Sequence, residues 1–188
     1  MLKKTIVGLV LLMLSGTAFA GSLSLQAKAS YFFPSDTYFK SIYGSAPTFG
    51  AKVAYDLAIG LGLWVDVEFY SETGKTDVTG DTSMAGETTK LRLVPVTAGV
   101  RYVFLPGGSV SPYLGAGIGL FQYKETNSIG TVSESDIGFA VQAGVLVRLG
   151  RTAFVDLQGS YSSCKVNPAG VEAELGGIKA GLGLGVAF

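Results

Sequence analysis

Apolar and polar residues alternate with a period of two along eight segments of this 188-residue chain. Successive side chains of a β-strand point to opposite faces, so each segment predicts a strand with one apolar face and one polar or small face. The predicted strands cover residues 23–31, 48–57, 61–70, 94–104, 112–120, 138–149, 155–161 and 177–188. At this chain length a single all-β domain is expected.

The apolar faces of these segments contain no Asp, Glu, Lys or Arg, and every charge within a segment falls on the other face. A soluble sandwich tolerates stray charges because its outer face meets water, whereas a basic residue at mid-depth on a lipid face costs about 2–4 kcal/mol. The pattern therefore predicts that the apolar face points outward to lipid. A soluble lipocalin-like barrel would require the two faces to be reversed.

The connections between segments alternate strictly between short and long. The short connections are 58–60, 105–109 and 150–152, and the long, polar ones are 34–46, 71–89, 124–134 and 163–174. The outward aromatic residues divide between the loop end (Tyr31, Phe49, Phe69, Phe139 and Tyr161) and the turn end (Tyr55, Tyr102, Phe104 and Phe188). Short periplasmic turns, longer extracellular loops and two aromatic girdles are typical of outer-membrane barrels. We expect an eight-stranded antiparallel up-and-down transmembrane β-barrel with both termini in the periplasm.

The first twenty residues have the features of a secretory signal peptide. Lys3 and Lys4 precede an apolar stretch from Ile6 to Leu14, which is too short to span a bilayer. The small residues Ala18 and Ala20 predict cleavage before Gly21. The expected organisation is a signal peptide over residues 1–20 and a barrel domain over 21–188, exported to the outer membrane of a bacterium.

Composition supports a membrane protein and argues against a nucleic-acid partner. Charged residues make up 15% of the chain, below the ~25% usual for a soluble domain. The 14 Lys and Arg residues are balanced by 14 Asp and Glu residues, so no basic face for nucleic acid is expected.

The charges within the strands fall on the inward face and form a candidate lumen network. Its members are Lys28, Lys52, Asp56, Asp66, Glu68, Arg101, Arg148, Asp156 and Lys179. We interpret them as a satisfied network that fills the interior, because an eight-stranded barrel is just wide enough for its own side chains. A polar conduit is the alternative. The turn at 58–60 sets Lys52 opposite Asp66, and the turn at 150–152 sets Arg148 near-diagonal to Asp156, so both are expected to be favourable pairs.

The runs Val94–Tyr102 and Ser111–Gly117, together with terminal Phe188, resemble the small outer-membrane β-barrel family. That family includes OmpA-like transmembrane domains, opacity-type and OmpX-like adhesins and OmpW-like barrels, and the resemblance covers the whole mature chain. It implies that the last strand, through Leu184, Val186 and Phe188, is the signal by which the insertion machinery assembles the barrel. Because the sequence ends with the barrel, no peptidoglycan-binding domain is expected.

The chain contains no His, on which the enzymatic barrels of the outer membrane rely as acid or base. We therefore expect a non-enzymatic protein without catalytic residues, metal or cofactor. A cation site on the acidic residues of the second long connection is a lesser alternative, because these residues lack the spacing of a calcium loop. They are Glu72, Asp77, Asp81 and Glu87. The lone Cys164 is expected to be a free thiol at the start of the last loop, reachable from outside, and a crosslink to a partner is the lesser alternative.

Two functions remain open for such a barrel. The first is a structural or surface-interaction role, in which four extracellular loops contact an external ligand. The alternative is a narrow OmpW-like transport barrel that passes small apolar molecules through a lateral opening. Pro95 and Pro112 lack a ladder donor and would mark a local irregularity at such an opening, although placement at a strand edge or a bulge explains them equally well. The expected partners are outer-membrane lipid, lipopolysaccharide and the insertion machinery.

Overall fold

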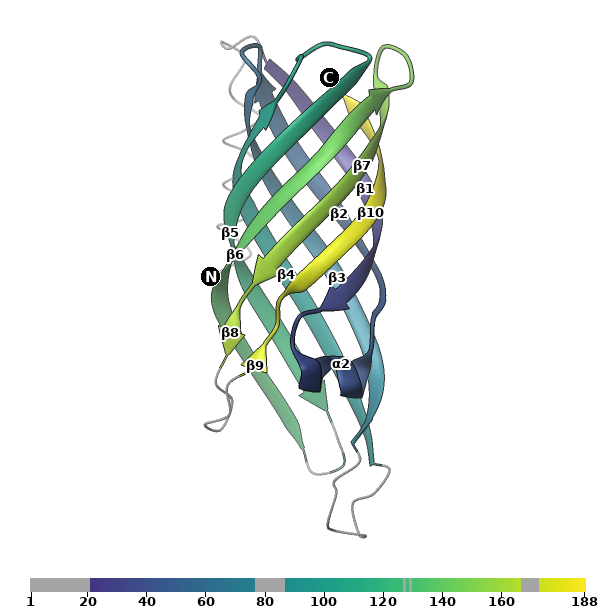
Figure 1. Ribbon diagram of the computed structural model, residues 1–188, viewed down its shortest axis with the longest axis vertical. Helices are drawn as coiled ribbons and strands as arrows, with labels where there is room; N and C mark the ends of the chain where they lie inside the picture. Colours follow the sequence, from purple (N-terminus) through teal and green to yellow (C-terminus); the bar gives the residue numbers. More distant parts are fainter. Residues whose placement is uncertain (1–20, 77–86, 127, 129, 167–172) are drawn as a thin grey trace.

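The computed structural model describes residues 21–76, 87–126, 128, 130–166 and 173–188, and within them eight strands close into one antiparallel barrel. Each barrel strand pairs with its neighbours along the chain, and β10 pairs with β1 to close the wall (Figure 1). The barrel strands are β1 (Gly21–Pro34), β2 (Ala46–Leu57), β3 (Leu61–Thr76), β4 (Glu87–Val103), β5 (Val110–Thr126), β6 (Thr131–Arg148), β7 (Ala153–Ser163) and β10 (Gly177–Ala187). The predicted fold class is confirmed.

The apolar face of each strand points away from the barrel axis. On β10, Ile178, Leu182 and Leu184 are 57%, 56% and 67% exposed. The inward faces instead hold buried polar and charged side chains, such as Gln26 and Lys52. A lipocalin-like arrangement, with apolar residues inside and charges outside, is therefore wrong. No helix in the described part of the chain is long and apolar enough to cross a membrane.

Four strands extend further at the loop end than the alternation predicts. β3 and β4 stay paired as far as Thr76 and Glu87, and β5 and β6 stay paired as far as Thr126 and Thr131. Together they form a sheet that continues beyond the rest of the barrel at the lower end of Figure 1. The hydrophobic alternation fails to predict these extensions because a strand outside the bilayer has no lipid-facing side.

The long connections also contain secondary structure that the sequence pattern does not predict. The first carries the short helix α2 (Thr37–Tyr43), and the last carries the two-stranded sheet of β8 (Lys165–Val166) and β9 (Ala173–Glu174). The Asp36 side chain caps α2 by accepting a hydrogen bond from the Phe39 N–H, and Gly44 ends the helix with a φ of 70°. These elements bring the first and last loops together over the barrel mouth.

Candidate functional site

The lumen midway along the barrel is crossed by ion pairs between β1, β3 and β10. The Lys28 ammonium pairs with the Asp66 carboxylate and lies 2.6 Å from Glu68 Oε1. The other oxygen of Glu68 pairs with Lys179. The side chains of Lys28, Asp66 and Glu68 are nearly inaccessible to solvent, so each charge depends on the others for compensation.

Asp156, on β7, is the centre of a second group. It is 0% exposed, and both its oxygens lie 3.0 Å from the Tyr113 hydroxyl, which donates to them. Gln26 donates to Asp156 Oδ2 over 3.0 Å, and the Lys52 ammonium lies 3.6 Å from the same oxygen. Lys52 also donates to the side-chain oxygens of Gln142 and Gln158.

Arg101 and Asp56 form a third pair, nearer the turn end. Arg101 Nε and Nη2 donate to the two Asp56 oxygens over 2.8 and 2.6 Å, in the bidentate geometry that suits guanidinium and carboxylate. The guanidinium also lies 5.5 Å from the centroid of the Tyr113 ring, which links this pair to the Asp156 group.

Inward glycines create the room that these long side chains occupy. A Cβ at Gly183 would lie 1.8 Å from the Gln26 amide nitrogen, and one at Gly144 would lie 2.6 Å from the Tyr113 hydroxyl. Gly144 lies directly opposite Tyr113, and Gly183 lies opposite Asp156, so each of these two donors to Asp156 packs against a glycine. These glycines of β6 and β10 serve the packing of the lumen.

The structure corrects the predicted pairings while keeping the predicted register. Lys52 does lie opposite Asp66 in the β2–β3 ladder, but its acidic contact is Asp156, on the far side of the barrel, and Asp66 pairs with Lys28. A strand register fixes neighbours along the wall, whereas long side chains in a closed barrel also reach across it.

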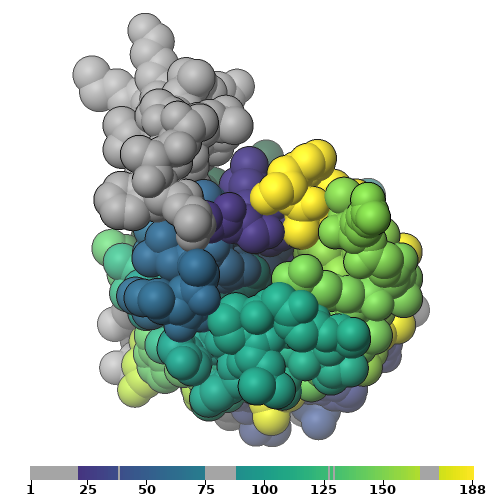
Figure 2. Space-filling view, turned by 90° about the horizontal axis from the view of Figure 1, so that it is seen from above, coloured from purple at the N-terminus to yellow at the C-terminus, as the bar shows by residue number. Residues whose placement is uncertain are grey.

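Arg148 is the one residue of the predicted network that stands apart from it. It is exposed at the turn end, and among the described residues its side chain has no ion pair. The near-diagonal carboxylate of Asp156 is already satisfied by Gln26, Tyr113 and Lys52. Arg148 instead lines an open pocket of about 440 Å³ at the turn end, the end that faces the viewer in Figure 2.

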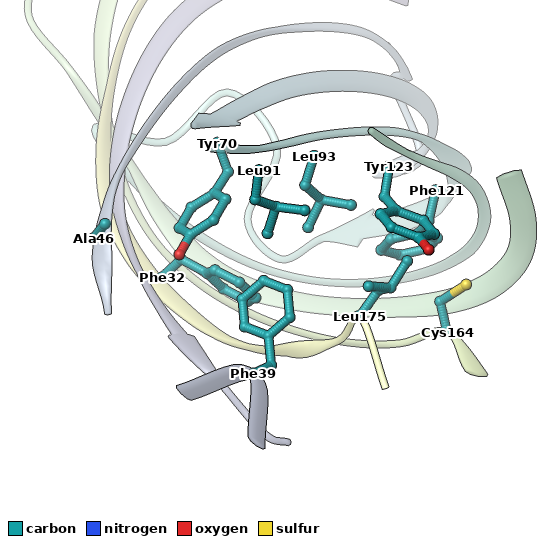
Figure 3. Close-up of a cluster of buried hydrophobic side chains, with 10 residues drawn as sticks. All are labelled: Phe32, Phe39, Ala46, Tyr70, Leu91, Leu93, Phe121, Tyr123, Cys164 and Leu175. Atoms are coloured by element: carbon teal, nitrogen blue, oxygen red, sulfur yellow. The ribbon is translucent and has the colours of Figure 1, made fainter. Parts of the chain in front are cut away.

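A hydrophobic cluster, here called the loop-end cap, fills the other end of the lumen (Figure 3). Aromatic rings from several elements meet there: the Phe32 ring lies 5.3 Å from that of Tyr70 and 6.4 Å from that of Phe39 on α2. The cap consists of Phe32, Phe39, Ala46, Tyr70, Leu91, Leu93, Phe121, Tyr123, Cys164 and Leu175. It separates the ion pairs from the loop end of the barrel.

Hydrogen bonds to the loops hold the cap in place. The second oxygen of Asp36 accepts from the backbone N–H of Glu174, so one carboxylate joins α2 to the last loop. The Leu175 N–H donates to the Cys164 carbonyl over 2.8 Å. Burial and the carboxylate of Glu125 raise the pKa of the Tyr43 phenol above its ordinary value, so this α2 side chain stays neutral. The sequence signals that could have revealed α2 are Asp36 and Gly44, a helix cap at each end.

Cys164 is buried within the cap, so the expectation that it is reachable from outside is wrong. Only 2% of its surface is exposed. Burial, with the carboxylates of Asp136 and Glu174, raises the pKa of the thiol to about 11. Because the thiolate is the reactive form, both effects suppress reaction with external reagents.

We therefore expect Cys164 in the folded barrel to react with a membrane-impermeant maleimide at least ~100-fold more slowly than an exposed cysteine, because its folded-state pKa lies above the ordinary range. The matched control is a cysteine at exposed Ser133 in a Cys164→Ser background, measured on intact cells. Leu175→Ala, which opens the packing beside the thiol, should accelerate labelling. Equal rates for Cys164 and the Ser133 control would contradict the buried position.

The remaining predicted residues lie on the barrel seam or outside the described chain. Ala18, Ala20, Asp77 and Asp81 are outside the described residues. Leu184 and Val186 lie on the outward face of β10, and Phe188 exchanges two backbone hydrogen bonds with Leu23 of β1. In the described part of the chain, no group of three or more His, Cys, Asp or Glu residues could hold a metal ion.

Comparison with known proteins gives one family and several related folds. The family described as "Outer membrane protein beta-barrel domain" matches residues 6–188. Protein opa of Haemophilus influenzae is 28% identical in an alignment 115 residues long, which covers 56% of this chain and 95% of that protein. Neisserial surface protein A shares the fold at 21% identity with a TM-score of 0.63, over 88% of this chain and 97% of its own. The outer membrane protein OprG of Pseudomonas aeruginosa matches at 13% identity with a TM-score of 0.64, over 90% of this chain and 97% of its own.

Proposed function

Because the chain belongs to the outer membrane protein β-barrel family, we propose that this bacterial outer-membrane protein is a non-enzymatic structural or surface protein that acts through its four extracellular loops. The observation that carries this proposal is the filled lumen. Ion pairs occupy its middle, and the loop-end cap closes its extracellular side. A barrel filled in this way presents a closed outer surface rather than a channel.

Further observations support a role without catalysis. The chain contains no His, and each of the four carboxylates of the predicted lumen network contacts a cationic side chain: Asp56, Asp66, Glu68 and Asp156. Neisserial surface protein A, which has the same fold, bears a surface role in its name. An external ligand would contact the loops and the extended sheet of β3 to β6. Lipid and lipopolysaccharide would contact the outward face of the barrel. The insertion machinery would act earlier, during assembly.

Transport is the second candidate, and one irregularity in the barrel wall favours it. The β3–β4 ladder pairs Val67 with Val96 and resumes at Tyr70 with Leu93, skipping two positions at Pro95. Proline has no N–H to donate to the ladder. Among the described registers this is the one interruption inside a ladder. The cavity beside Pro95 measures only about 10 Å³, hardly room for one water, so the described residues leave no path open beside Pro95.

Conductance and uptake test the proposed function against transport. The purified barrel in planar lipid bilayers should give no steady conductance above that of a protein-free bilayer, because the lumen is filled. Cells that display the barrel should take up naphthalene no faster than the same cells without it. Uptake that rises with expression and falls in Pro95→Val, which restores the ladder donor, would establish transport and contradict the surface role. Pro112→Val is the matched control, because Pro112 keeps its ladder partner Val145.

A further inference from the structure

The extended sheet of β3 to β6 separates its charges by face. On the outward face, Lys90, Arg92 and Lys124 are all exposed. The acidic residues of the same strands occupy inward-facing positions: Glu72, Glu125, Glu134 and Asp136. Directly opposite residues share a face, so the ladder pairs place the outward basic residues among hydroxyl groups: Arg92 lies opposite Ser71, and Lys124 lies opposite Ser133. Among the described residues of this face there is no acid to neutralise them.

Arg92 and Lys124 also lie directly opposite each other in the β4–β5 ladder. Opposite residues of an antiparallel pair have Cβ atoms about 5 Å apart, and like charges at that position are destabilising. Lys90 is two residues before Arg92 and therefore lies on the same face. Among the described residues none of these three forms an ion pair. The described part of the protein thus leaves this concentration of positive charge uncompensated.

The position of the three residues along the barrel indicates what compensates them. Phe69 and Phe139, both 49% exposed, belong to the loop-end girdle of outward aromatics, which in outer-membrane barrels marks the interface between hydrocarbon and headgroups. The continued β3–β4 register sets Phe69 beside Val94, and Arg92 lies two residues further toward the loops. Two residues of a strand span about 7 Å, so the basic residues lie just outside the hydrocarbon, at the level of the headgroups.

We propose that Lys90, Arg92 and Lys124 form a docking site on the outer wall of the barrel for the phosphate groups of lipopolysaccharide in the outer leaflet. The site rests on the proposed lipopolysaccharide partner and names the residues that bind it. Arginine suits bidentate contact with phosphate, and the two lysines supply point charges on either side. A bound phosphate also relieves the repulsion between Arg92 and Lys124, so binding and wall stability are coupled.

Lipid A with defined phosphorylation tests the site. The full barrel is inserted in dimyristoylphosphatidylcholine vesicles, with or without bisphosphorylated lipid A, and lipid A binding is titrated. The variant Lys90→Gln/Arg92→Gln/Lys124→Gln should bind at least ~5-fold more weakly than wild type, since a single exposed ion pair contributes up to about fivefold in affinity. The matched control is Lys40→Gln/Lys165→Gln, which removes two exposed lysines from the same end of the molecule but not from this face. It should bind as wild type does.

Thermal unfolding gives a second readout that does not depend on measuring affinity. In phosphatidylcholine alone the triple variant should unfold at the same temperature as wild type or a higher one, because it lacks the Arg92–Lys124 repulsion. With bisphosphorylated lipid A in the vesicles, wild type should instead unfold at a higher temperature than the triple variant. Undiminished binding by the triple variant, or equal weakening in the control, would overturn the site. Wild-type binding that is the same for bisphosphorylated and dephosphorylated lipid A would overturn the lipopolysaccharide partner itself.

Discussion

Replacing Asp156 with alanine should lower the free energy of unfolding by about 3–5 kcal/mol, the cost of removing one member of a buried ion pair. The reason is the number of groups that depend on this carboxylate. The substitution leaves the Lys52 ammonium without an acidic contact and leaves the Tyr113 hydroxyl and the Gln26 amide without their acceptor. Unfolding in urea, followed by the shift in gel migration between folded and unfolded barrel, measures the loss.

Two further variants separate charge from packing. Glu134→Ala removes an exposed carboxylate and should change stability by no more than about 0.5 kcal/mol. Lys52→Met combined with Asp156→Leu should recover much of the loss, because replacing a buried pair by apolar residues of similar volume is often neutral. If Asp156→Ala costs no more than Glu134→Ala, Asp156 is not the centre of the network. If the interaction energy of Lys52 with Asp66 is larger than that of Lys52 with Asp156, the pairing expected from the register is the correct one.

The barrel wall was predictable from the sequence because lipid constrains every second residue of a membrane-spanning strand. The absence of charge on one face fixed which side points outward, and short turns fixed the registers, as the Lys52–Asp66 neighbours show. The same constraint ends where the bilayer ends. In the extensions of β3 to β6 the alternation is reversed, with Leu91 and Leu93 buried inward and Arg92 exposed outward, so a pattern of lipid-facing apolar residues does not predict them.

The ion pairs inside the lumen were not predictable from the alternation alone. A ladder specifies only adjacent strands, whereas Lys52 on β2 reaches Asp156 on β7 across the barrel. The loop-end cap was also missed, because it assembles apolar residues from segments far apart in the chain, including Phe39 on α2 and Leu175 after β9. For the same reason Cys164 was expected at an exposed loop, although the adjoining loops bury it.

The seam between the first and last barrel strands makes Phe188 the second residue with a large expected effect. Phe188 donates to the Leu23 carbonyl over 2.8 Å and accepts from the Leu23 N–H over 3.1 Å, so it forms the last pair of the closing ladder. Its ring is 75% exposed at the turn-end interface, where an aromatic side chain suits the girdle. From the family resemblance we also expect that the assembly machinery recognises this strand, including Leu184 and Val186, during insertion.

Deleting Phe188 should reduce the amount of barrel assembled in the outer membrane of cells at least ~10-fold, while barrel refolded in detergent loses only about 1–2 kcal/mol, the value of a few backbone hydrogen bonds at a strand end. The loss of assembly should exceed the loss of stability because a frayed last pair leaves most of the β1–β10 ladder intact. A recognition signal, by contrast, is no longer recognised once one of its essential residues is missing. Heat-modifiable migration of barrel from membrane fractions measures assembly, and urea unfolding of refolded protein measures stability.

Phe188→Tyr is the matched control, since it keeps an aromatic ring at the interface and should assemble normally. Normal surface levels of the deletion variant would show that Phe188 contributes packing alone, and a matching loss in both measurements would assign the assembly defect to an unstable seam.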